Sequence, residues 1–146
     1  MLLLTDKVST EIRQWGARDY PNETCGALLG SEREDRRVVH SLFPLANRRE
    51  DSPRNRFAIT ADDFRDAERA ALDQRLDVVG WYHSHPDHPA RPSEFDREHA
   101  WPWYSYVIVS VAAGEPREMT SWLLADDRSE FHPEEISAQE SGLTAK

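Results

Sequence analysis

One cysteine, Cys25, is all that the 146-residue sequence contains, so no disulfide can form within the chain. Nothing therefore indicates an oxidising compartment. A closed structural zinc site rich in thiolates is excluded for the same reason. Because its surroundings in the sequence are apolar and no histidine is adjacent, Cys25 is expected to be a small buried residue rather than a nucleophile.

Lysine is also scarce, and the 27 acidic residues outnumber the 18 lysines and arginines. The formal net charge is -9, and Lys7 and Lys146 are the only lysines. This balance argues against non-specific binding to nucleic acid or to an anionic membrane. The apolar start, residues 1–6, is too short for the core of a signal sequence or for a membrane span, so the expected location is the cytoplasm.

The remaining composition is typical of one globular domain, with 38% hydrophobic and 31% charged residues. Apolar periodicity and turn signals predict helices at 6–20, 60–76 and 93–101. They predict strands at 2–4, 24–30, 37–45, 77–82, 104–111 and 118–125. This order indicates the α/β (α+β) class, with a mixed β-sheet flanked by helices.

We make further structural predictions for three segments. The helix at 60–76 begins with a capping box of Thr60 and Asp63. Its apolar face is expected to comprise Phe64, Ala67, Ala71, Leu72 and Leu76. A polar segment at 47–56 carries Arg48, Arg49, Arg54 and Arg56 and is expected to be an exposed loop. The domain is predicted to span residues 1–131, followed by an acidic, flexible tail at 132–146.

The residues with the clearest chemical signature are His83-Ser-His85, followed after seven residues, the first of which is Pro86, by Ser93-x-x-Asp96. Residues i and i+2 of a strand point to the same face, so both imidazoles can reach one ion. Asp96 is expected on the first turn of a helix, where it can turn back toward the histidines. Two neutral nitrogens and one carboxylate leave Zn²⁺ a fourth position for water, which is the pattern of a catalytic site.

These residues resemble the signature of the JAMM metalloproteases, also called MPN+ domains. The family has a glutamate just before a glycine-containing apolar strand, and Glu23 in Glu-Thr-Cys-Gly-Ala-Leu-Leu-Gly matches it. By itself, Glu23 is typical of an exposed acid beside a turn. The resemblance extends to about residue 125 and implies a JAMM/MPN domain with a fold similar to that of cytidine deaminases.

The resemblance also implies roles for the matching residues. His83, His85 and Asp96 would bind one zinc ion per chain, with a water as the fourth ligand. Glu23 would be the general acid/base and Ser93 an oxyanion donor. The implied reaction is hydrolysis of a peptide or isopeptide bond, and the implied substrate is the C-terminal tail of a small ubiquitin-like or sulfur-carrier protein. The arginines of 47–56 are a candidate dock for an acidic face of that partner.

Other functions remain open at this point. The chain could be an MPN scaffold that keeps zinc for stability and has no turnover, or a small-amide hydrolase unrelated to ubiquitin-like tails. A zinc deaminase is disfavoured, because its Pro-Cys-x-x-Cys element requires two cysteines.

Overall fold

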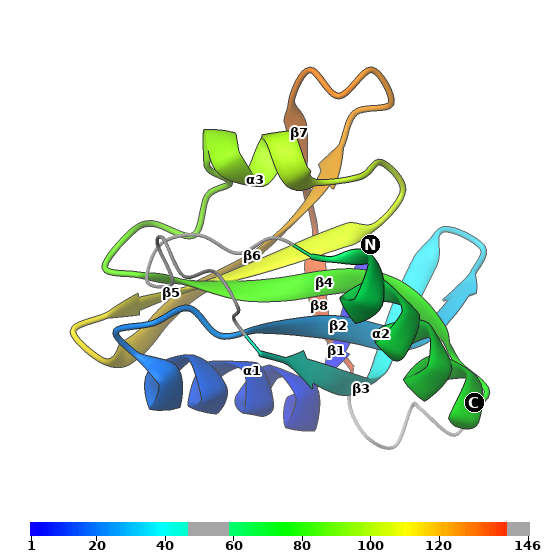
Figure 1. Ribbon diagram of the computed structural model, residues 1–146, viewed down its shortest axis with the longest axis horizontal. Coiled ribbons are helices and arrows are strands. Elements are labelled where there is room, and N and C mark those ends of the chain that lie inside the picture. Colours follow the sequence, from blue (N-terminus) through cyan, green and yellow to red (C-terminus); the bar gives the residue numbers. More distant parts are fainter. Residues whose placement is uncertain (47–58, 140–146) are drawn as a thin grey trace.

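The structure is a computed structural model that describes residues 1–46 and 59–139. A single sheet of eight strands, in the order β7-β6-β5-β4-β2-β3-β1-β8, forms its centre (Figure 1). β1 pairs in parallel with β3 and with β8, β4 pairs in parallel with β5, and the other neighbours are antiparallel. The predicted mixed sheet flanked by helices is therefore confirmed.

Most elements lie where periodicity predicted them. The strands are β1 (Leu2–Thr5), β2 (Cys25–Arg33), β3 (Arg36–Leu45), β4 (Asp77–Pro86), β5 (Ser105–Ala112), β6 (Glu115–Leu124), β7 (Phe131–Glu134) and β8 (Ile136–Gln139). The helices are α1 (Asp6–Asp19), α2 (Ala61–Asp73) and α3 (Glu94–His99). None of these helices, within the described ranges, is both long and apolar enough to span a bilayer.

Helix α1 covers one face of the sheet (Figure 1). The Thr5 side chain accepts a hydrogen bond from the Val8 N–H and so caps the helix. Val8 and Ile12, one turn apart, are fully buried against the sheet. The core on this side comprises Leu2, Leu4, Val8, Ile12, Leu28, Val39, Val79, Tyr82, Val107, Val109 and Val111.

Helix α2 covers the opposite face and begins with the predicted capping box of Thr60 and Asp63. Ala67 and Ala71 are buried, as expected from their spacing of four residues. Leu72 was expected on the same face, but 75% of it is exposed, so this part of the prediction is wrong. Each helical residue turns by about 100°, which carries Leu72 off the stripe that contains Ala71.

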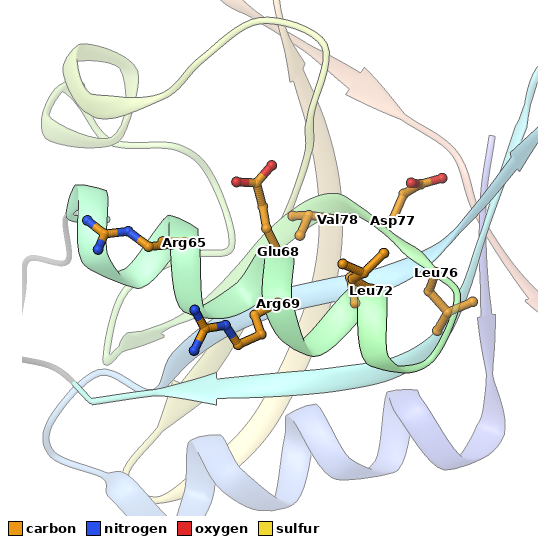
Figure 2. Close-up of a pocket in the computed structure, with 8 residues that line it drawn as sticks. Arg65, Glu68, Arg69, Leu72, Leu76, Asp77 and Val78 are labelled. Atoms are coloured by element: carbon orange, nitrogen blue, oxygen red, sulfur yellow. The ribbon is translucent and has the colours of Figure 1, made fainter.

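Leu72 instead lines a shallow groove of about 460 Å³ along the outer side of α2 (Figure 2). Arg65 and Arg69 flank the groove, and Asp77 and Val78, at the start of β4, close its far side. The two histidines of the motif lie near the other end of β4. This groove is therefore separate from the candidate metal centre.

The pairing of β2 with β4 is set by a close approach between Gly26 and Tyr82, which are partners in the register. A Cβ atom on Gly26 would overlap the Tyr82 ring and hydroxyl. Tyr82 is fully buried on the α1 side, and its ring packs beside Trp15. Glycine at position 26 thus leaves room for the Tyr82 ring to lie over β2 on the α1 face of the sheet.

The C-terminal segment departs from expectation. Residues 131–134 and 136–139 form β7 and β8, so the predicted flexible tail is wrong for this part of the chain, whereas 140–146 lie outside the described residues. β7 pairs with β6 at one edge of the sheet, and β8 pairs with β1 at the other. Ladder hydrogen bonds hold these short strands, and Ile136 of β8 and Phe131 of β7 also pack against the two core clusters. The arginine-rich segment 47–56 also lies outside the described residues.

Candidate metal centre

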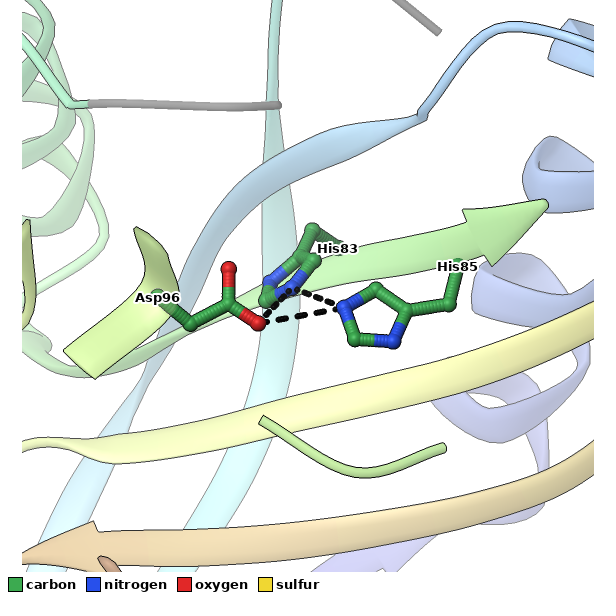
Figure 3. A group of neighbouring side chains, drawn as sticks. All are labelled: His83, His85 and Asp96. Carbon is green, nitrogen blue, oxygen red and sulfur yellow. Dashed lines mark hydrogen bonds and ion pairs between the residues drawn. The ribbon is translucent and has the colours of Figure 1, made fainter. Parts of the chain in front are cut away.

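His83 and His85 lie near the carboxyl end of β4, and their side chains are buried at 6% and 8% exposure. β4 extends through both histidines and ends at Pro86, which cannot donate a ladder hydrogen bond. Neighbouring strands hold this segment from both sides: His83 is paired with Cys25 of β2 and with Ile108 of β5. The two imidazoles therefore stand on one face of a rigid central strand (Figure 3).

Asp96 approaches the histidines from α3, which begins with a second capping box. The Asp96 N–H donates to Ser93 Oγ at 3.0 Å, and the Ser93 N–H donates to Asp96 Oδ2 at 2.9 Å. The same Oδ2 atom faces both imidazoles. The cap thus sets the start of the helix and also orients the carboxylate oxygen that points into the site.

Three potential ligand atoms form a nearly equilateral triangle. Nε2 of His83 lies 3.1 Å from Nε2 of His85, and these nitrogens lie 3.3 Å and 3.1 Å from Asp96 Oδ2. A tetrahedral ion with ligands at about 2.0–2.1 Å would place neighbouring ligand atoms roughly 3.3–3.4 Å apart. The triangle has the dimensions of one face of such a tetrahedron, so these residues could hold a metal ion.

The protonation of His85 supports this arrangement. Its Nδ1 lies 2.9 Å from the Pro89 carbonyl oxygen, which can only accept, so Nδ1 carries a proton. When a metal ion is bound, the ring is neutral and its Nε2 presents a lone pair to the ion; without a metal, Nε2 can carry a second proton and donate to Asp96 Oδ2. Two acceptors at 3.1 Å repel each other unless a proton or a metal ion lies between them.

Asp96 is held in its ionised form. Burial by itself would raise the pKa of this carboxyl, but the charges and hydrogen bonds of His83 and His85 outweigh it. The net result is a pKa well below the usual range of an aspartate. The site therefore offers a carboxylate, not a carboxylic acid, at any physiological pH.

The loop between Pro86 and α3 is pinned by side chains that the sequence did not single out. Ser110 Oγ donates to the His88 carbonyl and Thr120 Oγ1 to the Ala90 carbonyl, each at 2.6 Å. Together with the bond from His85 to Pro89, they hold three successive carbonyls. The partners are 22 and 30 residues away in the chain, so no local pattern could reveal them. His88 itself is exposed, as expected of a loop residue.

Glu23 is buried, with 4% exposure, and is not the exposed acid that its local sequence suggested. Burial raises the pKa of its carboxyl to about 8, while the charge of His85 lowers it and that of Asp96 raises it. Its Oε1 atom is buried and has no hydrogen-bond partner among the described residues. Glu23 is outside the triangle but close enough for its pKa to respond to two of the three candidate ligands.

Ser93 is exposed and lies at the N-cap of α3, one turn before Asp96. Its Oγ accepts the Asp96 N–H, which leaves the hydroxyl hydrogen available to another acceptor. The structure thus joins Ser93 to the ligand group through Asp96.

A cavity of about 20 Å³, roughly large enough for one water, lies beside the ligand triangle. Its wall includes Trp81 and Tyr106, as well as His99, to which no role was given from the sequence. Cys25 is buried nearby, and burial raises the pKa of its thiol well above the usual range. The expectation that Cys25 is a buried residue is confirmed, and its protonated thiol is a poor nucleophile.

Comparison with known families gives a match over most of the chain. Residues 5–125 match the family described as prokaryotic homologues of the JAB domain. This range includes Glu23, His83, His85, Ser93 and Asp96, and all elements from α1 to β6.

Individual relatives agree with this match. A desampylase of Haloferax volcanii is 36% identical over 106 residues, which are 72% of this chain and 74% of the relative. A CysO-cysteine peptidase of Mycobacterium tuberculosis is 32% identical over 123 residues, 84% of this chain and 82% of the relative. The solution structure of a Salinibacter ruber protein has 51% identity and a TM-score of 0.74, over 93% of this chain and 90% of that one.

Proposed function

Since the chain belongs to the family of prokaryotic homologues of the JAB domain, the JAMM/MPN family, we propose that it is a zinc-dependent peptidase or isopeptidase. We propose as its substrate the C-terminal tail of a small ubiquitin-like or sulfur-carrier protein. That the chain is a hydrolase follows from its family and from relatives named for hydrolytic activities. The observation that carries the proposal is the triangle of His83, His85 and Asp96, together with the buried Glu23, whose Oε1 has no hydrogen-bond partner among the described residues.

The two imidazoles and the carboxylate would hold one zinc ion. Nitrogen and oxygen donors suit Zn²⁺, and three protein ligands leave one coordination position open. When bound, zinc supplies a Lewis acid and lowers the pKa of its water ligand to about 7. The chain's own part is to hold the three donors rigidly, through β4 and the capping box of α3.

Glu23 would move the proton. In the metal-free protein its pKa is raised to about 8 by burial. A cation held by the neighbouring ligands would lower this pKa, because an opposite charge favours the ionised form. Glu23 Oε1 would then accept a proton from the attacking water and pass it to the leaving amine nitrogen, a role worth about 10²–10⁴-fold in rate.

Ser93 would stabilise the charge that develops on the substrate. Its hydroxyl hydrogen is available because its Oγ already serves as an acceptor in the capping box. Donated to the developing oxyanion of the scissile carbonyl, such a hydrogen bond is worth about 3–4 kcal/mol. The cap also keeps Ser93 at a constant position relative to Asp96.

The names of the relatives support the substrate class. One relative is named a desampylase and another a CysO-cysteine peptidase, and both names denote cleavage of an attached group. A cytoplasmic location is proposed along with this substrate.

Fusions of ubiquitin-like and sulfur-carrier proteins, each with a different residue after Gly-Gly, provide the test. The zinc-loaded protein is incubated with each fusion, with and without chelator, and the products are identified by mass. Cleavage after the tail that the chelator abolishes is the expected result. Cleavage of short amides but of none of the fusions would instead indicate a small-amide hydrolase.

A further inference from the structure

Ser84, the residue between the two metal-binding histidines, is fully buried on the side of the sheet away from them. Because side chains alternate along a strand, it points toward α1, whereas His83 and His85 point toward the site. Its Cβ lies 3.6 Å from where a Cβ on Gly16 of α1 would stand. Ser84 therefore cannot touch a substrate at the candidate metal centre.

Two hydrogen bonds connect Ser84 to the segment that carries Glu23. The Thr24 N–H donates to Ser84 Oγ at 2.8 Å, and the Ser84 N–H donates to the Thr24 carbonyl at 3.0 Å. The register of β2 with β4 begins one residue later, at the pair of Cys25 and His83. The hydroxyl of Ser84 thus satisfies a buried backbone donor just outside the regular ladder.

Glu23 has little else to fix its carboxylate. Its Oε1 has no hydrogen-bond partner among the residues that the structure describes, so the position of this buried side chain depends on packing and on its backbone. On the N-terminal side, the Asn22 N–H bonds to the Asp19 carbonyl at the end of α1. On the C-terminal side, Thr24 is held by Ser84.

We propose that Ser84 is a positioning residue, which sets the place of Glu23 relative to the two histidines. β4 then aligns both parts of the site. His83 and His85 present the ligand atoms on one face of the strand, and Ser84, on the other face, holds the backbone next to Glu23. This inference rests on the proposed function, because the role of Glu23 as acid/base is part of that proposal. A displacement of about 1 Å at a reacting group can lower a rate about 10²-fold.

The test compares three substitutions of Ser84. Ser84→Ala removes the acceptor of the Thr24 N–H, Ser84→Thr keeps it, and Ser84→Cys replaces it with a weak acceptor of similar shape. Ser105→Ala is the matched control. Ser105 is also fully buried, and its Oγ also accepts a hydrogen bond, from Arg37 Nη1 at 3.0 Å, but on β5 and away from Glu23.

Three quantities are measured on folded, zinc-loaded protein: kcat and KM on a cleaved fusion, and zinc affinity by chelator competition. For Ser84→Ala we expect kcat to fall about 10–100-fold, with KM and zinc affinity within about 3-fold of wild type. Ser84→Thr should restore most of the lost kcat, and Ser105→Ala should leave it unchanged. If Ser84→Ala does not fold, Ser84→Cys takes its place, with a smaller loss in the same direction.

Hydrogen exchange of the Thr24 amide gives a readout that needs no turnover. In metal-free protein the exchange should be at least about 10-fold faster in Ser84→Ala than in wild type, since the amide loses its buried acceptor. The inference is overturned if Thr24 remains protected, if kcat stays at the wild-type value, or if zinc affinity falls together with kcat. Absence of cleavage by wild type would reject the proposed function instead. The exchange experiment would still report on the hydrogen bond from the Thr24 N–H to Ser84 Oγ.

Discussion

The Oδ2 atom of Asp96 lies 3.1 Å from Nε2 of His85 and also accepts the backbone N–H of Ser93 at 2.9 Å. One carboxylate oxygen thus belongs both to a helix cap and to the candidate metal centre. Local helix geometry and ligand geometry are coupled at this atom.

Asp96→Asn should abolish stabilisation by zinc. In wild type, zinc at about 1,000 times its dissociation constant should raise the free energy of unfolding by about 4 kcal/mol. The neutral amide is a much weaker ligand than the carboxylate, so the variant should show little or no shift. Thermal melting of both proteins with zinc and with chelator measures this. Equal shifts in the two proteins would mean that zinc binds elsewhere.

Glu23→Gln should keep the metal and lose turnover. The amide preserves the size of the buried side chain but cannot accept a proton, so kcat should fall by about 10²–10⁴-fold. Zinc content by atomic absorption should stay at one ion per chain. Glu118→Gln, an exposed glutamate on β6, is the control and should behave as wild type. A variant that retains more than about a tenth of the turnover would remove Glu23 from the proposed mechanism.

Glu23 should also give the metal-free protein a pH-dependent stability. Its folded pKa of about 8 exceeds the ordinary value of 4.5, so the folded state keeps the proton longer than the unfolded state does. Between these two values stability should therefore fall with rising pH, by at most about 1.4 kcal/mol per unit from this group. Below 4.5 the carboxyl is protonated in both states, and its contribution is constant.

Glu23→Gln removes this titration, so the variant should become progressively more stable than wild type as pH rises from 5 to 8. Urea unfolding with chelator present, at pH 5, 6.5 and 8, measures the difference between the two proteins. A difference that does not change with pH would show that the folded protein does not raise the pKa of Glu23.

Gly26→Ala should destabilise the pairing of β2 with β4, because the added methyl overlaps the ring of Tyr82. We expect a loss of about 1–3 kcal/mol, as for other overpacked cores. The Tyr82 hydroxyl is buried and has no hydrogen-bond partner among the described residues, so Tyr82→Phe should be neutral or slightly stabilising. In the double variant, Phe should relieve part of the overlap. Additive losses in urea unfolding would contradict this coupling.

The arginines at 48, 49, 54 and 56 lie outside the described residues, so a prediction about them rests on the sequence alone. If this segment docks an acidic face of the partner, changing all four to alanine should raise KM for a protein substrate. Cleavage of a short peptide with the same tail should not change, and the difference should shrink at high salt. Equal losses on both substrates would reject the docking role.

Local patterns in the sequence determined much of this protein. The period of two in a strand places His83 and His85 on one face, and the capping boxes mark the starts of α2 and α3. These features depend on residues within a few positions of one another. Backbone geometry alone therefore relates them, and they could be predicted without knowledge of the fold.

Other features were decided by contacts between distant segments. Glu23 could be singled out only through a family resemblance, because its burial depends on the strands around it. Thr120 meets its loop carbonyl across 30 residues, and Ser84 meets Thr24 across 60. The residues near the C-terminus became edge strands because β1 and β6 offered them unpaired backbone. Such pairings have no local signature, since each partner's hydrogen-bonding capacity is satisfied only when the whole sheet assembles.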